Sequence, residues 1–306
     1  DLTVAPIAKA EGRVAALTRN TEKTAAPFGE PPFFASGDDA RKDVRTMTIR
    51  EFLKEAEERF RVAEFESSAL EAAYILEEAT GMRRGAFALC MDRSLSGEEL
   101  AFARNCLRRR LAHEPYQYVF GKASFRDLEL RAGPGCLIPR PETEYLVDLI
   151  LKDLPRNAEV CELGVGSGAI SLAIASERPD VRVTGTELSP AAMRWAEENR
   201  IRLGLRNVRF LSGDLFEPVR GERFHRIVAN LPYVPESERE SLPPNVRDYE
   251  PPEALFAGAD GLEVIPRALA AAPPAPLPRG CAWVELAYGH AAAATALAER
   301  LFPVAE

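Results

Sequence analysis

Alternation of short apolar runs with helical runs, beginning at about residue 141, is the feature that most limits how this chain can fold. Runs typical of buried strands occur at 159–163, 181–187, 208–212, 226–230 and 282–286. Helical runs precede or follow them at 141–153, 168–177, 190–203, 261–271 and 290–301. Strands that alternate with helices of this length form an open parallel sheet covered by helices. We therefore expect an α/β domain over residues 141–306.

Residues 46–114, which precede this domain, have a helical pattern without strand runs. Apolar residues recur every three or four positions over residues 49–60, and a second helical run covers residues 67–80. Ser96 and Glu99 have the spacing of a capping box, which predicts the start of a third helix. We therefore expect a small all-helical domain over residues 46–114.

Two further segments complete the predicted organisation. Residues 115–140 mix aromatic residues with Gly and Pro, and residues 127–131 alternate apolar with charged side chains, which predicts a β-hairpin linker. Residues 1–45 mix Ala, Pro, Gly and charged residues with little periodicity. We interpret them as an extension that does not have to be ordered.

Composition excludes several classes of protein. The content of 46% hydrophobic and 28% charged residues is ordinary for a globular chain, and no apolar run approaches the ~20 residues of a membrane helix. The net charge of −8 disfavours non-specific nucleic-acid binding, and we interpret the basic run at 104–110 as a solvated helix face. The five cysteines form no C-x-x-C pair and only three histidines are present, so we expect no metal. Scattered cysteines without a signal pattern favour the cytoplasm, and nothing calls for more than a monomer.

A glycine-rich segment at 162–170 leaves the first strand and enters a helix. Its glycines allow a tight turn and close approach to a ligand, and the helix that follows offers free N–H groups. The next strand ends at Glu187, 23 residues beyond Gly164. A carboxylate there is placed to accept hydrogen bonds from the ribose hydroxyls of an adenosine-containing ligand. Preparing the next helix is the alternative role, but Ser189 and Pro190 already supply that helix start.

The third strand is followed by Asp214, Leu215 and Phe216. The aspartate at this strand end is suited to accept from an adenine amino group, with the two apolar side chains against the ring. A simple turn aspartate explains the same residue equally well.

The fourth strand is followed by Asn230, Leu231, Pro232 and Tyr233. The side-chain carbonyl of Asn230 and the backbone carbonyl of Leu231 are acceptors, Pro232 fixes the chain, and Tyr233 offers a flat face. Such a pocket suits an NH₂ group attached to an sp² carbon, in a glutamine amide or an adenine. The alternative, a strand-end turn closed by proline, is disfavoured because the glycine loop lies at the same sheet edge.

Together these motifs resemble class I S-adenosylmethionine-dependent methyltransferases. Residues 137–144, Leu-Ile-Pro-Arg-Pro-Glu-Thr-Glu, resemble the I-P-R-P-E-T-E signature of the protein-(glutamine-N5) methyltransferases that modify peptide chain release factors, the HemK/PrmC family. Residues 249–256 and 260–262 are similar to that family's Y-E-P-x-x-A-L-F and D-G-L stretches, and residues 109–121 to the exit from its N-terminal domain. The likeness covers about residues 47–302.

The resemblance implies a Rossmann-like methyltransferase sheet that binds S-adenosyl-L-methionine and releases S-adenosyl-L-homocysteine. The glycines would cradle the methionine portion of the cofactor, Glu187 would hold its ribose, and Leu215 would line its adenine. The full set of cofactor-binding residues implied is Glu162, Gly164, Val165, Gly166, Ser167, Gly168, Glu187, Leu188, Asp214, Leu215 and Asn230.

The resemblance also implies a protein substrate, a peptide chain release factor that presents the glutamine of its GGQ motif. The residues expected to carry the reaction are Asn230, Leu231, Pro232 and Tyr233, which would grip the glutamine amide. The substrate-binding residues near the mouth of the site are expected to be Arg140, Pro141, Glu142 and Thr143. The helical domain would help to receive the protein substrate, and no direct nucleic-acid or membrane partner is expected.

Three departures from the family pattern leave alternatives open. Leu231 replaces the first proline of N-P-P-Y, and N-L-P-Y also occurs in rRNA adenine-N6 methyltransferases. Ala287 and His290 replace the Gly and Gln of E-x-G-x-x-Q. The chain ends at Glu306 without room for the antiparallel edge pair, so we expect a fragment or an open sheet edge. A ribosomal-protein glutamine, an rRNA adenine, or a cofactor-binding module without catalysis therefore stand beside the release factor.

Overall fold

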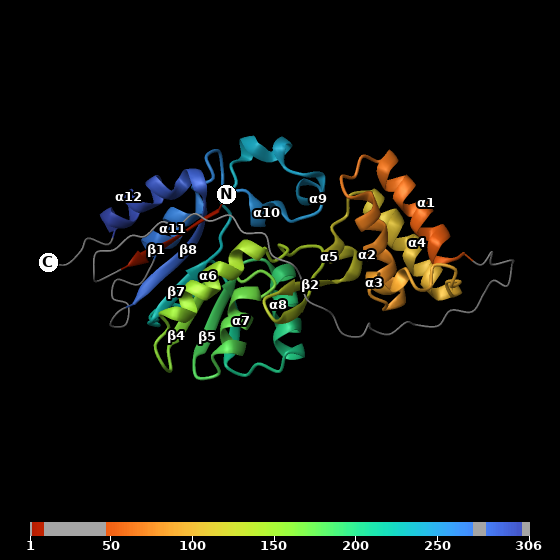
Figure 1. Cartoon of the computed structure of the whole chain (residues 1–306). Helices are drawn as coiled ribbons and strands as arrows, with labels where there is room; N and C mark the ends of the chain where they lie inside the picture. The colour runs from red at the N-terminus through yellow and green to blue at the C-terminus, as the bar shows by residue number, and fades with distance from the viewer. Residues whose placement is uncertain (1, 9–46, 272–279, 302–306) are drawn as a thin grey trace. The chain divides into compact units, whose positions relative to one another are not determined.

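The structure is a computed structural model that describes residues 2–8, 47–271 and 280–301 (Figure 1). The described residues fall into two compact units, a helical unit that ends at Phe120 and an α/β unit that begins at Gly121 and also includes residues 2–8. Within these residues no helix is long and apolar enough to cross a membrane.

The helical unit is built from amphipathic helices with defined ends. Its elements are α1 (Ile49–Val62), α2 (Ser68–Thr80), α3 (Arg84–Phe87), α4 (Gly97–Leu111) and α5 (Tyr116–Phe120). The capping box expected at Ser96 is present, because the Ser96 hydroxyl accepts from the Glu99 N–H and the Glu99 carboxylate accepts from the Ser96 N–H. The apolar faces pack on one another around Phe52, Phe60 and Leu107.

The basic run on α4 is only partly the solvated face that its sequence predicts. Arg110 is buried, donates to both carboxylate oxygens of Glu71 at 2.9 and 3.1 Å, and lies over the Tyr116 ring. Arg109 pairs with Glu114 and donates to two backbone carbonyls of α5. These two arginines hold α5 and α2 against α4, so the expectation of a solvated face was wrong for them.

The α/β unit contains a β-hairpin and a larger sheet. The hairpin consists of β2 (Lys122–Phe125) and β3 (Leu128–Arg131). Among the described residues the sheet has six strands in the order β1-β8-β7-β4-β5-β6. Their bounds are β1 (Leu2–Ala8), β4 (Glu159–Leu163), β5 (Arg182–Glu187), β6 (Val208–Ser212), β7 (Arg226–Ala229) and β8 (Cys281–Ala287). From β8 to β6 all neighbours are parallel, as the alternating pattern predicts.

Helices cover both faces of the sheet. Their bounds are α6 (Pro141–Lys152), α7 (Ala169–Glu177), α8 (Pro190–Arg202), α11 (Val264–Ala271) and α12 (Ala291–Leu301), with short helices η1 (Glu217–Val219), η2 (Glu236–Ser241), α9 (Pro244–Arg247), α10 (Pro252–Leu255) and η3 (Tyr288–His290) between them. Apolar side chains of α6, α7 and α8 pack on Val160, Val228 and Trp283. Apolar side chains of α11 pack on Cys161, Ala229 and Val284. These are the next residues along the same three strands, so their side chains point to the opposite face of the sheet.

The observed ends of the strands lie within about one residue of the predicted ends. The helix α11, however, begins three residues later than the predicted helix at 261–271. The reason is a turn at residues 260–262, where the Leu262 N–H donates to the Asp260 carboxylate at 3.0 Å and Gly261 has φ of +77°. An aspartate that accepts from the backbone two residues on favours a turn over a helix.

Of the two alternatives expected for this edge of the sheet, a fragment or an open edge, the structure does not show the open edge at β8. β1 pairs with β8 in antiparallel register, from Leu2 opposite Ala287 to Ala8 opposite Cys281 (Figure 1). An edge strand carries a row of unpaired N–H and C=O groups that an extended segment satisfies. Part of the expected N-terminal extension is thus a strand, whereas residues 9–45 and 302–306 lie outside the described residues.

Parallel pairing sets where a ligand site can form. Because the strands run in the same direction, the loops after β4, β5, β6, β7 and β8 all leave the sheet at one edge. The glycine segment, Glu187, Asp214, Asn230 and the end of β8 are therefore brought to this edge.

Glu162, on β4, is a buried carboxyl that gives a test of the fold. It is 2% exposed and accepts from the backbone N–H and the hydroxyl of Ser171 at the start of α7. Burial raises the pKa of Glu162 to about 8, although the hydrogen bonds from Ser171 oppose this shift.

We predict that Glu162→Gln removes part of the pH dependence of stability. Between the unfolded pKa of 4.5 and the folded pKa of about 8 the folded chain holds the extra proton, so wild-type stability falls as pH rises through this range. The measurement is urea unfolding at several pH values, followed by the fluorescence of Trp195 and Trp283, both in the α/β unit. Equal slopes of unfolding free energy against pH in the two proteins would contradict the assignment.

Candidate active site

The glycine segment forms an open cradle at the end of β4. Gly164, Gly166 and Gly168 have φ of +71°, +56° and +83°, a region that other residues rarely adopt. The Gly164 N–H donates to the Thr186 carbonyl at 2.9 Å, which ties the turn to β5. A Cβ added at Gly166 would meet no atom within 4 Å. Space above the middle of this loop is therefore available to a ligand, as the expected cofactor requires.

Glu187 faces the same loop. One carboxylate oxygen accepts from the Gly166 N–H and the other from the Ser189 N–H, each at 2.8 Å. The residue therefore supports the start of α8 and also lies beside the glycine loop, while its role toward a ribose stays a prediction. A carboxylate oxygen has two lone pairs, so acceptor capacity remains for hydroxyl groups. Leu188, the next residue, is 68% exposed.

Asn199 on α8 is a supporting residue that the sequence did not single out. Its side chain is 1% exposed and donates to the carbonyls of Ser167 and Arg131 at 3.0 Å each. Its oxygen accepts from the Arg131 N–H at 2.6 Å. The glycine loop and the hairpin are thus joined through one buried amide. The sequence signal that could have identified Asn199 is a polar residue on the buried face of a predicted helix.

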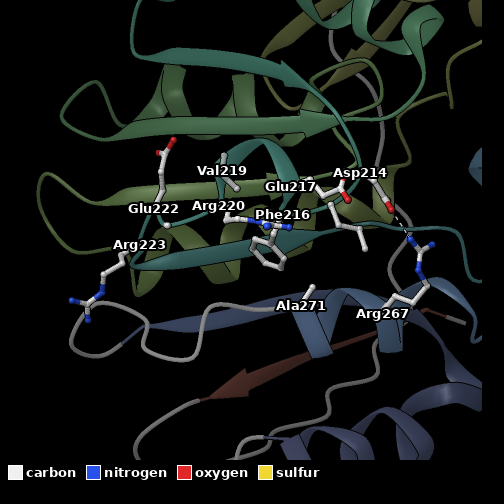
Figure 2. A pocket seen from close by; sticks show the side chains of 11 residues that line it. Asp214, Phe216, Glu217, Val219, Arg220, Glu222, Arg223, Arg267 and Ala271 are labelled. Carbon is white, nitrogen blue, oxygen red and sulfur yellow. Dashed lines mark hydrogen bonds and ion pairs between the residues drawn. The ribbon is translucent and has the colours of Figure 1, made fainter.

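The loop after β6 holds Asp214 in an ion pair. Its carboxylate accepts from the Arg267 guanidinium of α11 at 2.5 Å, and Figure 2 shows the two side chains facing each other. The sequence predicts an adenine acceptor or a turn residue at Asp214, and it does not predict the ion pair with Arg267. A pocket of about 700 Å³ opens beside them. It is lined by Asp214, Leu215, Phe216, Glu217, Val219, Arg220, Gly221, Glu222, Arg223, Arg267 and Ala271.

The residues after β7 meet a buried carboxylate on β8. Asn230 donates from Nδ2 to the Thr143 hydroxyl at 3.2 Å, and Thr143 donates to Glu285 at 2.8 Å. Tyr233 donates from its hydroxyl to the other oxygen of Glu285 at 3.4 Å. Three residues predicted for the site, from segments far apart in the sequence, therefore converge on Glu285.

Burial governs the ionisation of this group. Glu285 is fully buried, which raises its pKa, while hydrogen bonds from Thr143, Tyr233 and Asn230 lower it. Burial also raises the pKa of Tyr233, so its hydroxyl stays protonated and acts as a donor. Sequence reasoning gave Glu285 no role, although it opens the E-x-G-x-x-Q-like segment at the end of a predicted strand.

Leu231, which replaces the family's proline, packs inward. It is 5% exposed and belongs to the core cluster of β4, β8 and α11. Its Cδ2 atom lies 3.0 Å from the position that a Cβ on Gly164 would occupy. The side chain therefore forms a wall shared by the glycine loop and the N-L-P-Y segment.

Arg140 and its neighbours divide into buried and exposed positions. Arg140 donates to Glu250 at 2.6 Å, and the second oxygen of Glu250 accepts from the Ile138 N–H at 3.1 Å. The I-P-R-P and Y-E-P-P segments are thus held together by a carboxylate that is 2% exposed. Pro141 and Glu142 are exposed at the start of α6, as a role at the mouth of a site requires.

The D-G-L turn packs on the N-L-P-Y segment. A Cβ at Gly261 would lie 2.3 Å from the Tyr233 carbonyl oxygen and 2.8 Å from His290 Cε1. Only glycine allows this close approach, which explains the residue at that position. His290 therefore packs against the turn at Gly261. Among the described residues, no group of three or more His, Cys, Asp or Glu side chains could hold a metal ion.

This arrangement is suited to hold an adenosine-containing ligand next to an acceptor site for an NH₂ group. The glycine loop and Glu187 lie at one side, and the Asn230 amide, anchored through its NH₂, lies after the adjacent strand. No side chain in it forms a nucleophile–base pair of the kind found in covalent catalysis, among the residues described.

Comparison with known proteins gives a consistent result. Residues 51–121 match the PrmC N-terminal domain, and residues 142–242 match the methyltransferase small domain. The release factor glutamine methyltransferase of Geobacter sulfurreducens is 41% identical over 226 residues, which cover 74% of this chain and 79% of that protein. The proteins of the same name from Vibrio cholerae and Deinococcus radiodurans are 40% and 36% identical, with 71% and 78% of this chain and 76% and 86% of those proteins covered.

The resemblance read from separate motifs is thereby confirmed over most of the chain. Both matched domains correspond to parts of the sequence in which those motifs were found. The chain belongs to the release factor glutamine methyltransferase family.

Proposed function

We propose that this protein transfers a methyl group from S-adenosyl-L-methionine to the side-chain amide nitrogen of the glutamine in the GGQ motif of a peptide chain release factor. The observation that carries the proposal is the convergence of Thr143, Asn230 and Tyr233 on Glu285, with Asn230 directly after β7, which pairs with the strand that leads into the glycine loop. The names of the relatives support the substrate, since the relative from Geobacter sulfurreducens is 41% identical over 226 residues. Release factors act in the cytoplasm, where we expect this protein to work as a monomer.

The cofactor-binding role rests on residues that fit such a ligand. Gly164, Gly166 and Gly168 would cradle the methionine portion, and Glu187 would accept from the ribose hydroxyls. Leu188 and Leu215 offer apolar surface for the adenine, with Asp214 nearby. When bound, S-adenosyl-L-methionine would supply a sulfonium methyl group: its S–C bond would break as the N–C bond forms, and one proton of the amide nitrogen would pass to solvent, which gives S-adenosyl-L-homocysteine and N5-methylglutamine.

The protein's own contribution is orientation. An amide nitrogen is a weak nucleophile because its lone pair is delocalised into the carbonyl. The Asn230 side-chain carbonyl and the Leu231 backbone carbonyl would accept the two N–H bonds and thereby aim the nitrogen. These acceptors also stabilise positive charge that develops on the nitrogen during the reaction. Tyr233 would contact the planar amide with its ring.

The helical unit is proposed to receive the protein substrate. The match of residues 51–121 to the PrmC N-terminal domain supports a role specific to this family. The exposed Pro141 and Glu142 are proposed to contact the release factor near the site.

A methyl-transfer assay tests the substrate directly. Labelled S-adenosyl-L-methionine is offered with a release factor, with its GGQ→GGA variant and with total rRNA, and intact mass counts the methyl groups. One methyl on the release factor, absent from the GGA variant, is the expected result. Label in rRNA would instead assign the site to adenine, and no label with retained cofactor binding would indicate a binding module without catalysis.

Asn230→Ala should abolish methyl transfer, because the amide clamp loses one of its two acceptors. Its affinity for S-adenosyl-L-methionine should stay within about tenfold of wild type, a change of ~1.4 kcal/mol or less. Turnover and calorimetric cofactor titration measure the two effects. Asn207→Ala is the matched control, since Asn207 donates to backbone carbonyls at 175, 178 and 181, outside the site. Near-normal turnover in Asn230→Ala would refute the clamp.

Glu187→Ala should weaken cofactor binding first. The substitution removes the proposed ribose acceptor and leaves the Gly166 and Ser189 N–H groups without their partner, which should raise the dissociation constant about tenfold or more. Glu197→Ala is the control. Glu197 lies on α8 and pairs with Arg200, so this variant should bind S-adenosyl-L-methionine as wild type does. An unchanged dissociation constant in Glu187→Ala would remove Glu187 from the cofactor site.

A further inference from the structure

A chain of hydrogen bonds runs from the buried Glu285 through Thr143 to the partly buried Asn230. Thr143 donates to Glu285 at 2.8 Å, and Asn230 Nδ2 donates to Thr143 at 3.2 Å. We propose that Glu285 is a positioning residue, which fixes the direction of this chain and so leaves the side-chain oxygen of Asn230 to accept from the substrate amide. The inference deepens the proposed function, on which its catalytic part rests.

The direction follows from the number of protons available. The hydroxyls of Thr143 and Tyr233 both donate to Glu285, and these hydrogen bonds favour the carboxylate form, which only accepts. The one hydroxyl proton of Thr143 is therefore directed to Glu285. The Thr143 oxygen is then left only as an acceptor toward Asn230. Only the NH₂ group of an asparagine side chain can donate to it, which assigns the other end, Oδ1, to the substrate. The two ends of an amide look alike in shape, so this chemical constraint is what selects between them.

Burial makes the constraint effective. Glu285 is fully buried and Thr143 is 3% exposed, so water does not compete for the bond between them, whereas the bond from Asn230 to Thr143 is partly buried. Tyr233 donates to the second oxygen of Glu285, so both oxygens are engaged by hydroxyl groups. One carboxylate therefore sets the orientation of the clamp residue Asn230 and also anchors the Tyr233 ring beside it.

Reversal of the chain would present the wrong group to the substrate. If the Thr143 proton pointed to Asn230, the amide would have to accept with its oxygen and turn its NH₂ outward. A substrate NH₂ group would then face another donor, and the hydrogen bond to Asn230 would be lost. Catalysis by orientation would fail, although the cofactor loop would be unchanged.

Two substitutions of Thr143 separate this role from packing. Thr143→Val keeps the shape and removes the hydroxyl, whereas Thr143→Ser keeps the hydroxyl and removes a methyl group. We expect Thr143→Val to lower kcat for the release factor about tenfold or more, and Thr143→Ser to stay within about threefold of wild type. A packing role predicts the opposite order, because valine fills the space and serine leaves a gap.

A double-mutant cycle tests whether Glu285 acts through Thr143. Glu285→Gln places an NH₂ group against one of two hydroxyls that donate in the wild type, so we expect a loss of kcat in the single variant. Thr143→Val/Glu285→Gln should be no slower than the slower single variant, since both break one chain. Losses that multiply would overturn the proposal. S-adenosyl-L-methionine affinity should stay within about threefold throughout.

A matched control accounts for lost stability. Val160→Ala removes buried volume from β4 on the face of the sheet covered by α6, α7 and α8, and touches none of these hydrogen bonds. Its melting temperature should fall while its kcat, measured well below melting, stays near wild type. Loss of kcat in Val160→Ala equal to that in Thr143→Val would contradict a specific role for the hydroxyl.

An NMR measurement tests the chain without any substrate. In protein labelled with ¹⁵N-asparagine, the side-chain NH₂ signal of Asn230 is assigned by its absence in Asn230→Ala. Its protons should exchange slowly with water in wild type and Thr143→Ser, and rapidly in Thr143→Val. Rapid exchange in wild type would overturn the hydrogen-bond chain. Slow exchange in a protein that methylates no release factor would instead retain the chain and reject the proposed substrate.

Discussion

Parallel pairing of β4 with β5 and β7 is the constraint from which the rest of the site follows. Residues 163 and 229 are paired neighbours at the ends of β4 and β7, so the glycine loop and the Asn230 segment leave the sheet side by side. Glu187 reaches the loop because β5 lies on the other side of β4. Neither loop could supply both a cradle and an acceptor pair alone. The sheet register brings them together before any side chain contributes.

Buried polar groups then fix what the backbone has brought close. Glu250 joins the I-P-R-P and Y-E-P-P segments, Glu285 joins α6 to the loop after β7, and Asn199 joins the hairpin to the glycine loop. Each is almost fully buried and engaged by several donors or acceptors. Leaving one such group without partners costs more than the bond itself contributes. These residues therefore specify one arrangement of loops that are otherwise free to vary.

The fold was predictable from the sequence because its signals are local. Strand runs, capping residues and the glycine turn depend on residues a few positions apart, and the bounds of β4 and β6 agree with the pattern to the residue. The central role of Glu285 was not predictable in this way. Its partner Thr143 lies 142 positions away, and no periodicity reports which two side chains will meet across a sheet. The Asp214–Arg267 pair and the pairing of β1 with β8 were missed for the same reason.

The packing of Leu231 has a consequence for how the two ligands affect each other. Its side chain touches the space above Gly164, so the turn that would hold the cofactor and the turn that would hold the substrate share one wall. Any coupling through this shared wall is reciprocal, so the cofactor and the substrate would change each other's affinity by the same factor. One aliphatic side chain is thus the contact between the turn proposed for the cofactor and the turn proposed for the substrate.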